Sequence, residues 1–257
     1  MHEPSWRNAL ATDSVTIRKP FGREASPIGI EIAERIVVMR ASQLYANFST
    51  SECTQIAERA RTRIAARNEL LFMQGQPFRQ LVLVESGCVK LTRLSANGSE
   101  VIVELRGPHD VIDLPAGSAS RHTSTARAVV NCKVLTWDWS FMETLLSTPQ
   151  ISRNICLILT GQLNELQERY HEISAEKVGR RLACTLIRLS RQFGIPTERG
   201  VEISLSRHEL AQMTGTTLFT VSRLISKWGE LGLVVPRREA VLILDAERLH
   251  RISEIED

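Results

Sequence analysis

Residues 206–228 read SRHELAQMTGTTLFTVSRLISKW, and this stretch decides the fold of the C-terminal part of the chain. Ser206 is followed three residues later by Glu209, the pattern of a capping box that satisfies free N–H groups at the start of a helix. Gly215 can adopt the positive φ that a tight turn after this helix needs. Thr217 is a good N-cap for a second helix. The stretch therefore predicts two short helices joined by a tight turn.

The predicted second helix has two faces of different character. One apolar stripe at helical spacing consists of Val221, Leu224, Ile225 and Trp228. At the same spacing, another side carries Phe219, Ser222, Arg223 and Ser226. A helix that packs one face on a core and turns an arginine outward suits the DNA-reading helix of a helix-turn-helix. The alternative is an ordinary helical hairpin whose polar face only meets water.

The sequence that follows favours the DNA-binding interpretation. Residues 233–244 read LVVPRREAVLIL, two apolar runs joined by a polar tip, which is typical of a β-hairpin. A hairpin directly after the second helix would be the wing of a winged helix. Arg237 and Arg238 at its tip would then be placed to contact phosphate.

Residues 205–228, LSRHELAQMTGTTLFTVSRLISKW, resemble the DNA-binding motif of the Crp/Fnr family of bacterial transcription regulators. The most specific part is TVSRL at residues 220–224, which is close to the Thr-(Val/Ile)-(Gly/Ser)-Arg core of that family's recognition helix. The resemblance implies a regulator that binds an inverted repeat in double-stranded DNA and works with RNA polymerase. The base contacts that it implies come from Leu218, Phe219, Ser222 and Arg223. The phosphate contacts that it implies come from Arg207, Thr216, Thr217, Lys227, Arg237 and Arg238.

Two of these positions imply specific base contacts. Arg223 stands where the family keeps an arginine that bonds a guanine, and its guanidinium fork can reach O6 and N7 together. Phe219 stands where the family usually keeps a glutamate. Because a phenyl ring cannot accept a hydrogen bond, we expect an apolar contact there, such as one with a thymine methyl group.

The whole-chain composition is that of an ordinary soluble protein, with 43% hydrophobic and 24% charged residues among 257. The absence of any run of 18 apolar residues excludes a transmembrane helix. The N-terminal sequence lacks the basic-then-apolar pattern of a signal peptide, so we expect a cytoplasmic protein without membrane contact. A formal net charge of +3 does not decide the partner, and DNA affinity has to come from where the arginines lie.

The five cysteines are scattered, without a C-x-x-C pair, at Cys53, Cys88, Cys132, Cys156 and Cys184. This pattern argues against a zinc site and against a disulfide framework. The oxygen-sensing branch of the family carries an iron–sulfur cluster on N-terminal cysteines, and no cysteine precedes Cys53. We therefore expect neither a metal nor a cofactor.

The middle of the chain predicts an antiparallel sandwich or roll. Between residues 70 and 137, short β-branched and apolar runs alternate with turns that contain Gly, Asn and Pro. Gly75, Gly87 and Gly98 fall where the family's cyclic-nucleotide-binding β-roll keeps glycine in its turns. The resemblance thus extends to an N-terminal sensor domain.

The residues that would hold a cyclic nucleotide are replaced in this chain. Residues 108–115, PHDVIDLP, align with the family's Pro-Gly-Asp turn and the Gly-Glu pair that follows it, so Asp113 and Leu114 stand where the ribose would be held. His122 and Thr123 stand where an Arg-Ser pair would hold the cyclic phosphate, a role that suits a guanidinium fork.

Leu166 and Gln167 likewise replace two hydroxyl residues that would meet adenine. With all three contacts altered, we expect that cyclic AMP does not bind. The effector-pocket candidates are Asp113, His122, Thr123 and Leu166. The effector stays open as an unknown small molecule or redox signal, with a haem on Cys88, His109 and His122 or a directly sensing thiol as weaker alternatives.

A long helix over residues 149–175 is predicted to join the two domains. Leu159, Leu166 and Ile173 repeat every seven residues, and Leu163 and Tyr170 form a second row. This seam fits a parallel coiled-coil homodimer. The alternative is a helix that packs on its own β-roll.

The sequence therefore predicts an α+β protein with a cyclic-nucleotide-binding-like antiparallel β-roll, a dimerisation helix and a C-terminal winged helix-turn-helix. The expected parts are an N-terminal extension with partial disorder (1–46), the β-roll (47–148), the dimerisation helix (149–175) and the winged helix (176–257). Two other classes of protein fit the sequence less well than this regulator. A cyclic-nucleotide-binding module without DNA binding should keep the phosphate-gripping arginine, and a small cupin-type enzyme needs more metal ligands than His109 and His122. We therefore expect no enzymatic activity.

Overall fold

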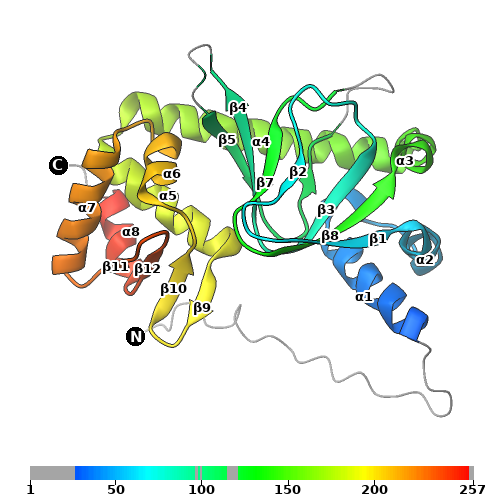
Figure 1. Ribbon diagram of the computed structural model, residues 1–257, viewed down its shortest axis with the longest axis horizontal. Helices are drawn as coiled ribbons and strands as arrows, with labels where there is room; N and C mark the ends of the chain where they lie inside the picture. Colours follow the sequence, from blue (N-terminus) through cyan, green and yellow to red (C-terminus); the bar gives the residue numbers. More distant parts are fainter. Residues whose placement is uncertain (1–26, 96–97, 99, 115–120, 255–257) are drawn as a thin grey trace.

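The computed structural model describes residues 27–95, 98, 100–114 and 121–254. Within them, a β-roll is followed by one long helix and then by a small winged-helix domain (Figure 1). This arrangement confirms the predicted α+β fold class. None of the described helices is both long and apolar enough to cross a membrane.

The β-roll consists of two four-stranded antiparallel sheets. In spatial order, the first sheet contains β1 (Arg61–Ala65), β8 (Cys132–Asp138), β3 (Gln80–Ser86) and β6 (Val111–Ile112). The second sheet contains β2 (Leu70–Phe72), β7 (Thr125–Ala128), β4 (Val89–Leu94) and β5 (Glu100–Arg106). Because side chains alternate between the two faces of a strand, the facing sheets bury a common apolar core that includes Val84, Val89 and Val134.

Three turns of the roll carry the glycines that the resemblance singles out. Gly75, Gly87 and Gly98 all have a positive φ, between +81° and +93°. Gly87 is also tightly enclosed, since an added Cβ would lie 2.6 Å from the Asn131 carbonyl oxygen. The expected turn positions are therefore confirmed, although Ala96 and Asn97 beside Gly98 lie outside the described residues.

The N-terminal segment differs from the expectation of an extension over residues 1–46. Helix α1 (Pro27–Ala41), the short η2 (Gln43–Tyr45) and α2 (Thr50–Arg59) belong to the β-roll domain. They form its second core against the outer face of the first sheet, where Met39, Leu44 and Tyr45 are almost fully buried. Much of the first half of α1 is exposed to solvent. For this reason the sequence of α1 does not show the clear apolar stripe of a helix that packs along its whole length. Residues 1–26 lie outside the described part of the chain.

Two helices follow the last strand of the roll, α3 (Trp139–Leu146) and the long α4 (Pro149–Ala175). Proline at the first position of α4 suits a helix start, because its missing N–H would have no partner there. The buried Asn154 side chain anchors α4 to the roll by donating to the Leu44 and Ala46 carbonyls, at 2.9 and 3.0 Å. From there α4 runs behind the second sheet to the C-terminal domain (Figure 1).

The C-terminal domain packs four helices around one small sheet. Its helices are α5 (Val178–Phe193), α6 (Arg207–Met213), α7 (Leu218–Glu230) and α8 (Ala246–Glu254). The sheet has the order β11 (Val234–Pro236), β12 (Val241–Ile243), β10 (Gly200–Ile203) and β9 (Ile195–Thr197). Strands β11 and β12 form the predicted wing. The segment before β10 supplies β9, which pairs with β10.

The two domains are in direct contact. Cys88 and Val129 of the β-roll belong to the same buried apolar cluster as Leu182, Leu210 and Trp228 of the winged helix. The winged helix therefore packs against the roll in addition to its covalent link through α4.

Candidate functional site

The helix-turn-helix is built by local hydrogen bonds. Ser206 Oγ accepts a bond from the Glu209 N–H at 3.2 Å, and Glu209 Oε2 accepts one from the Ser206 N–H at 2.9 Å. Gly215 in the turn has a φ of +59°, and Thr217 Oγ1 accepts from the Thr220 N–H at 3.2 Å. The capping box, the turn glycine and the second N-cap are thus confirmed.

Helix α7 presents the two faces that its sequence predicts. Val221, Ile225 and Trp228 are buried in the domain core, and Leu224 packs partly against it. The candidate base-contacting residues lie on the other side at the start of the helix. There Leu218 is 49% and Phe219 76% exposed, Arg223 is exposed, and Ser222 is partly buried.

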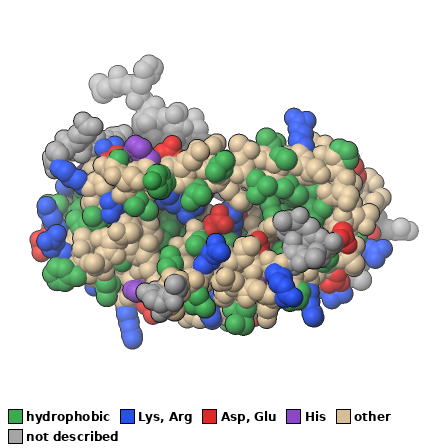
Figure 2. Space-filling model, turned by 90° about the horizontal axis from the view of Figure 1, so that it is seen from above, with side chains coloured by type: hydrophobic (Ala, Val, Ile, Leu, Met, Phe, Trp, Pro, Cys, Tyr) green, Lys and Arg blue, Asp and Glu red, His purple; other side chains and the backbone are tan. Residues whose placement is uncertain are grey.

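The candidate phosphate contacts differ in how accessible they are. Thr217, Lys227 and Arg238 are exposed, and Thr216 and Arg207 are partly buried. Arg237 at the wing tip makes an ion pair with Glu202. On the face of the molecule drawn in Figure 2, Lys and Arg side chains are spread among other residue types. Their placement, and not bulk charge, would decide DNA affinity.

The seam predicted along α4 lies open in the single chain. Its five residues are between 48% and 73% exposed, and they are Leu159, Leu163, Leu166, Tyr170 and Ile173. Within this helix, Ile151 and Asn154 near its start are the buried residues. From Leu159 onward, α4 therefore exposes an apolar row to the surface.

Two of the four effector-pocket candidates, Asp113 and His122, contact each other in the interior of the roll. His122 Nδ1 lies 2.9 Å from Asp113 Oδ2, so these two pocket candidates bond to each other. The His122 ring stacks on Phe72 at a centroid distance of 3.6 Å, and Phe78 lies against it at 4.8 Å. With only 5% of its side chain exposed, His122 is part of the interior.

The structure does not bring the other pocket candidates into this pair. Thr123 is exposed, and Leu166 lies on the open row of α4. The residues of the haem alternative line three different cavities, with Cys88 between the domains, His109 beneath α4 and His122 in the roll. Burial raises the pKa of the Cys88 thiol far above its usual range, which disfavours the reactive thiolate.

A polar cavity of about 350 Å³ lies between α4 and the turn after β5. Arg106 is buried there and pairs with Glu104 at 2.6 Å, while its Nε has no hydrogen-bond partner among the described residues. His109 has a φ of +72°, and its buried Nδ1 also lacks a partner there. Burial raises the pKa of the neighbouring Asp110 carboxyl. Of this cluster the sequence draws attention only to His109; its members lie within residues 104–110, and α4 supplies the opposite wall of the cavity.

Comparison with known proteins assigns both domains. A model of the cyclic nucleotide-binding domain matches residues 62–148, and a model of the Crp-like helix-turn-helix domain matches residues 180–252. Together they account for more than half of the chain.

Relatives of similar organisation match over most of their length. A CRP-like cAMP-activated global transcriptional regulator of Mycobacterium tuberculosis is 25% identical over 189 residues, which are 72% of this chain and 84% of that protein. The transcriptional activator protein Anr of Pseudomonas protegens is 27% identical over 193 residues, or 74% of this chain and 79% of that protein. The structure of FixK2 from Bradyrhizobium japonicum has the same fold, with a TM-score of 0.65 and 21% identity over 77% of this chain and 99% of that one.

The chain thus contains both a sensor domain of cyclic-nucleotide-binding type and a Crp-like helix-turn-helix domain. A module without DNA binding would lack the second of these domains, and the matched relatives are regulators of transcription, not enzymes. The chain therefore belongs to the Crp/Fnr family of DNA-binding transcription regulators.

Proposed function

We propose that the chain regulates transcription as a homodimer that reads an inverted-repeat DNA site with α7, in response to an effector other than cyclic AMP. The observation that supports this function most is the outward face of α7. Phe219 and Arg223 are free to contact a groove, while Val221, Ile225 and Trp228 fix the opposite face in the core. A rigid helix with an open polar face can enter the major groove without rearranging its own domain.

The homodimer is supported by the open row on α4. Five large apolar or aromatic side chains at coiled-coil spacing are about half exposed or more. Burying them against the same row of a second copy removes apolar surface from water, which is the main driving force of such seams. A parallel pair also places two copies of α7 on one side of the molecule, as a two-fold DNA site requires.

Base reading is assigned to the first turns of α7. Arg223 would donate to guanine O6 and N7, and Phe219 would pack on a thymine methyl group. Leu218 and Ser222 flank them and complete the contact with the base edges. Because both Leu218 and Phe219 are largely exposed, they are available for apolar contacts in the groove.

Backbone contacts are assigned to the residues around this helix. Thr216 and Thr217 lie at its start, where free N–H groups favour a phosphate. Lys227 lies a turn beyond Arg223, and Arg238 at the wing tip is exposed. Arg207 and Arg237 would have to turn toward the DNA, and Arg237 would have to leave Glu202.

A different effector is supported by the closed pair in the roll. A cyclic phosphate would need a free cationic donor, and His122 instead bonds Asp113 and stacks on Phe72. Opening this pair would leave a buried carboxylate without its partner, which is costly. The Mycobacterium tuberculosis relative is described as cAMP-activated. This chain therefore keeps the domain but not the nucleotide chemistry of that relative.

RNA polymerase is the further partner that the family membership suggests, and the cytoplasm is where bacterial DNA would be met. Both follow from the family and not from any site in the described residues.

The test is selection of DNA from a pool of random duplexes by the full-length protein, followed by footprinting. The expected product is an inverted repeat with half-site centres about 10–11 base pairs apart, one helical turn. Retention of no duplex, or a single asymmetric footprint, would contradict the proposal.

A further inference from the structure

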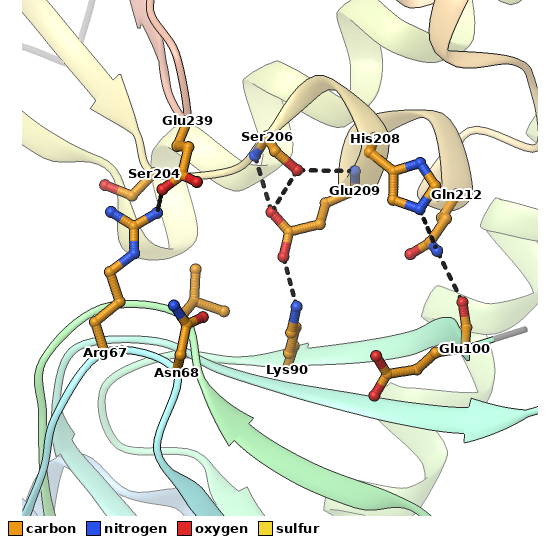
Figure 3. Close-up of a pocket in the computed structure, with 11 residues that line it drawn as sticks. Arg67, Asn68, Lys90, Glu100, Ser204, Ser206, His208, Glu209, Gln212 and Glu239 are labelled. Atoms are coloured by element: carbon orange, nitrogen blue, oxygen red, sulfur yellow. Dashed lines mark hydrogen bonds and ion pairs between the residues drawn. The ribbon is translucent and has the colours of Figure 1, made fainter.

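A polar cavity of about 380 Å³ separates the β4–β5 side of the roll from the start of α6 (Figure 3). Across it, Lys90 Nζ of β4 lies 2.7 Å from Glu209 Oε1 of α6. The two side chains are only 15% and 18% exposed. This ion pair is therefore shielded from solvent and salt, unlike the open pairs that contribute little on a protein surface.

The same carboxylate has a second function. Its other oxygen, Oε2, accepts hydrogen bonds from the Ser206 N–H and Oγ–H, both at 2.9 Å. Glu209 therefore closes the capping box of the first helix of the helix-turn-helix while it holds Lys90 of the sensor. Burial alone would raise the pKa of Glu209, but its bonds to Lys90 and Ser206 outweigh burial and hold that pKa below its usual value.

Two further contacts join the same parts of the molecule. Gln212 Nε2 of α6 donates to the Glu100 carbonyl of β5 at 2.7 Å. Arg67 of the roll makes an ion pair with Glu239 at the wing tip. Figure 3 shows these contacts on either side of the Lys90–Glu209 pair. The contacts between the roll and the helix-turn-helix thus extend from α6 to the wing.

The covalent link between the domains is short, but it does not by itself fix their relative orientation. Helix α4 ends at Ala175 and α5 begins at Val178, so residues 176 and 177 form the junction. Both have extended backbone angles, with ψ of +146° and +148°. The orientation of the winged helix therefore depends on its non-covalent contacts. These include the Arg188–Glu172 ion pair with α4, at 2.9 Å, and the largely buried Lys90–Glu209 pair with the roll.

The recognition face of α7 stays open in this arrangement. Phe219 is 76% exposed while α6 is held on the roll. The contacts around Lys90 therefore support α6 from the side away from that face and do not cover it. Two recognition helices about 34 Å apart must meet one DNA site, so a mobile domain loses orientational freedom when it binds.

We infer that Lys90 is a positioning residue for DNA binding: its ion pair with the capping carboxylate Glu209 sets the orientation of the helix-turn-helix on the sensor domain. A change in the roll that moves β4 is thereby transmitted to the first helix of the DNA-binding motif. The inference rests on the proposed contact between α7 and DNA.

The decisive variant is Lys90→Met, which keeps the length of the side chain and removes the ammonium group. We expect it to bind the duplex selected by the wild-type protein roughly tenfold more weakly, a typical size for coupling between two sites. The loss should be equal for all half-site variants, because no base contact changes. Lys90→Arg keeps the charge and should restore most of the affinity.

Lys133→Met is the matched control. Lys133 also belongs to the roll and pairs with Glu85 at 2.7 Å, but neither residue contacts the winged helix through this pair. Lys133→Met removes the same charge and the pairs of Lys133 with Glu85 and Glu34, both within the roll domain. Its DNA affinity should therefore stay within about twofold of the wild-type value.

A double-mutant cycle separates positioning from general damage. Glu209→Gln keeps an acceptor for the Ser206 cap and removes the charge that Lys90 needs. If the pair acts as one unit, Lys90→Met combined with Glu209→Gln should bind DNA no worse than the weaker single variant. In Lys90→Met, the pKa of Glu209 measured by NMR should also rise, since a stabilising cation is lost.

The outcomes distinguish this inference from the proposed function. Normal wild-type DNA binding with unchanged or tighter binding by Lys90→Met would overturn the inference alone. Fully additive losses in the double variant would overturn it as well. Failure of the wild-type protein to bind any duplex would overturn the proposed function and the inference together.

Discussion

The helix-turn-helix and the nucleotide pocket of the roll differ in how much of the family pattern they keep. In the first, Ser206, Glu209 and Thr217 cap their helices, and Arg223 stands on an open face. In the second, the pocket candidates Asp113 and His122 bond each other. The proposal is therefore that, within one chain, the output domain keeps its DNA-binding surface while the input domain no longer binds cyclic AMP. A shared fold does not by itself imply a shared ligand.

The largest effect is expected at Leu166, which the sequence assigns both to the pocket and to the dimer seam. Leu166→Asp would place a charge in an apolar seam, so we expect monomers and a loss of DNA affinity of at least about a hundredfold. Light scattering and DNA titration measure the two consequences. Gln167→Asp adds the same charge at the neighbouring position and should stay dimeric. A dimer that persists in Leu166→Asp would place the interface elsewhere.

A substitution at Arg223 tests whether this residue contacts a base, as the family pattern implies. Arg223→Ala should lower discrimination among half-site variants by about 1–3 kcal/mol, the typical worth of a bidentate contact with guanine. Lys227→Ala should weaken binding to all sequences alike and reduce the salt dependence by about one unit. Equal loss for every sequence in Arg223→Ala would mean that the arginine contacts phosphate instead.

A substitution at Ser206 is expected to have a smaller effect, on the free energy of unfolding. Ser206→Ala removes the acceptor for the Glu209 N–H and should lower the free energy of unfolding by about 1 kcal/mol. Urea unfolding followed by circular dichroism measures this change. Ser204→Ala, on the neighbouring loop, is the control and should be close to neutral. A Ser206→Ala variant as stable as the wild type would show that the cap contributes nothing in this context.

The two regions also differ in how well sequence predicts them. The helix-turn-helix depends on contacts three residues apart, such as Ser206 with Glu209, so its pattern is readable in a short window. The pocket depends on Phe72 and Phe78 meeting His122 across different parts of the roll. The sequence predicts that the nucleotide contacts are altered, but not that their replacements pair with each other.

Long-range packing explains the remaining differences. Lys90 and Glu209 are separated by 119 positions, and nothing local to β4 marks its lysine as a contact of α6. Met39 and Tyr45 belong to the core of the roll although α1 lacks a clear apolar stripe. In both cases the partner surface, which the chain forms only after folding, decides the role of the residue.

The comparison between the two regions is tested most directly by one titration. The affinity of the wild-type protein for its selected duplex is measured without cyclic AMP and with cyclic AMP up to about 1 mM. The Mycobacterium tuberculosis relative, described as cAMP-activated, serves as the positive control. We predict tight, sequence-specific DNA binding whose Kd is the same at every cyclic AMP concentration. A shift of that Kd at micromolar cyclic AMP would contradict the account, because the Asp113–His122 pair would then open for the nucleotide.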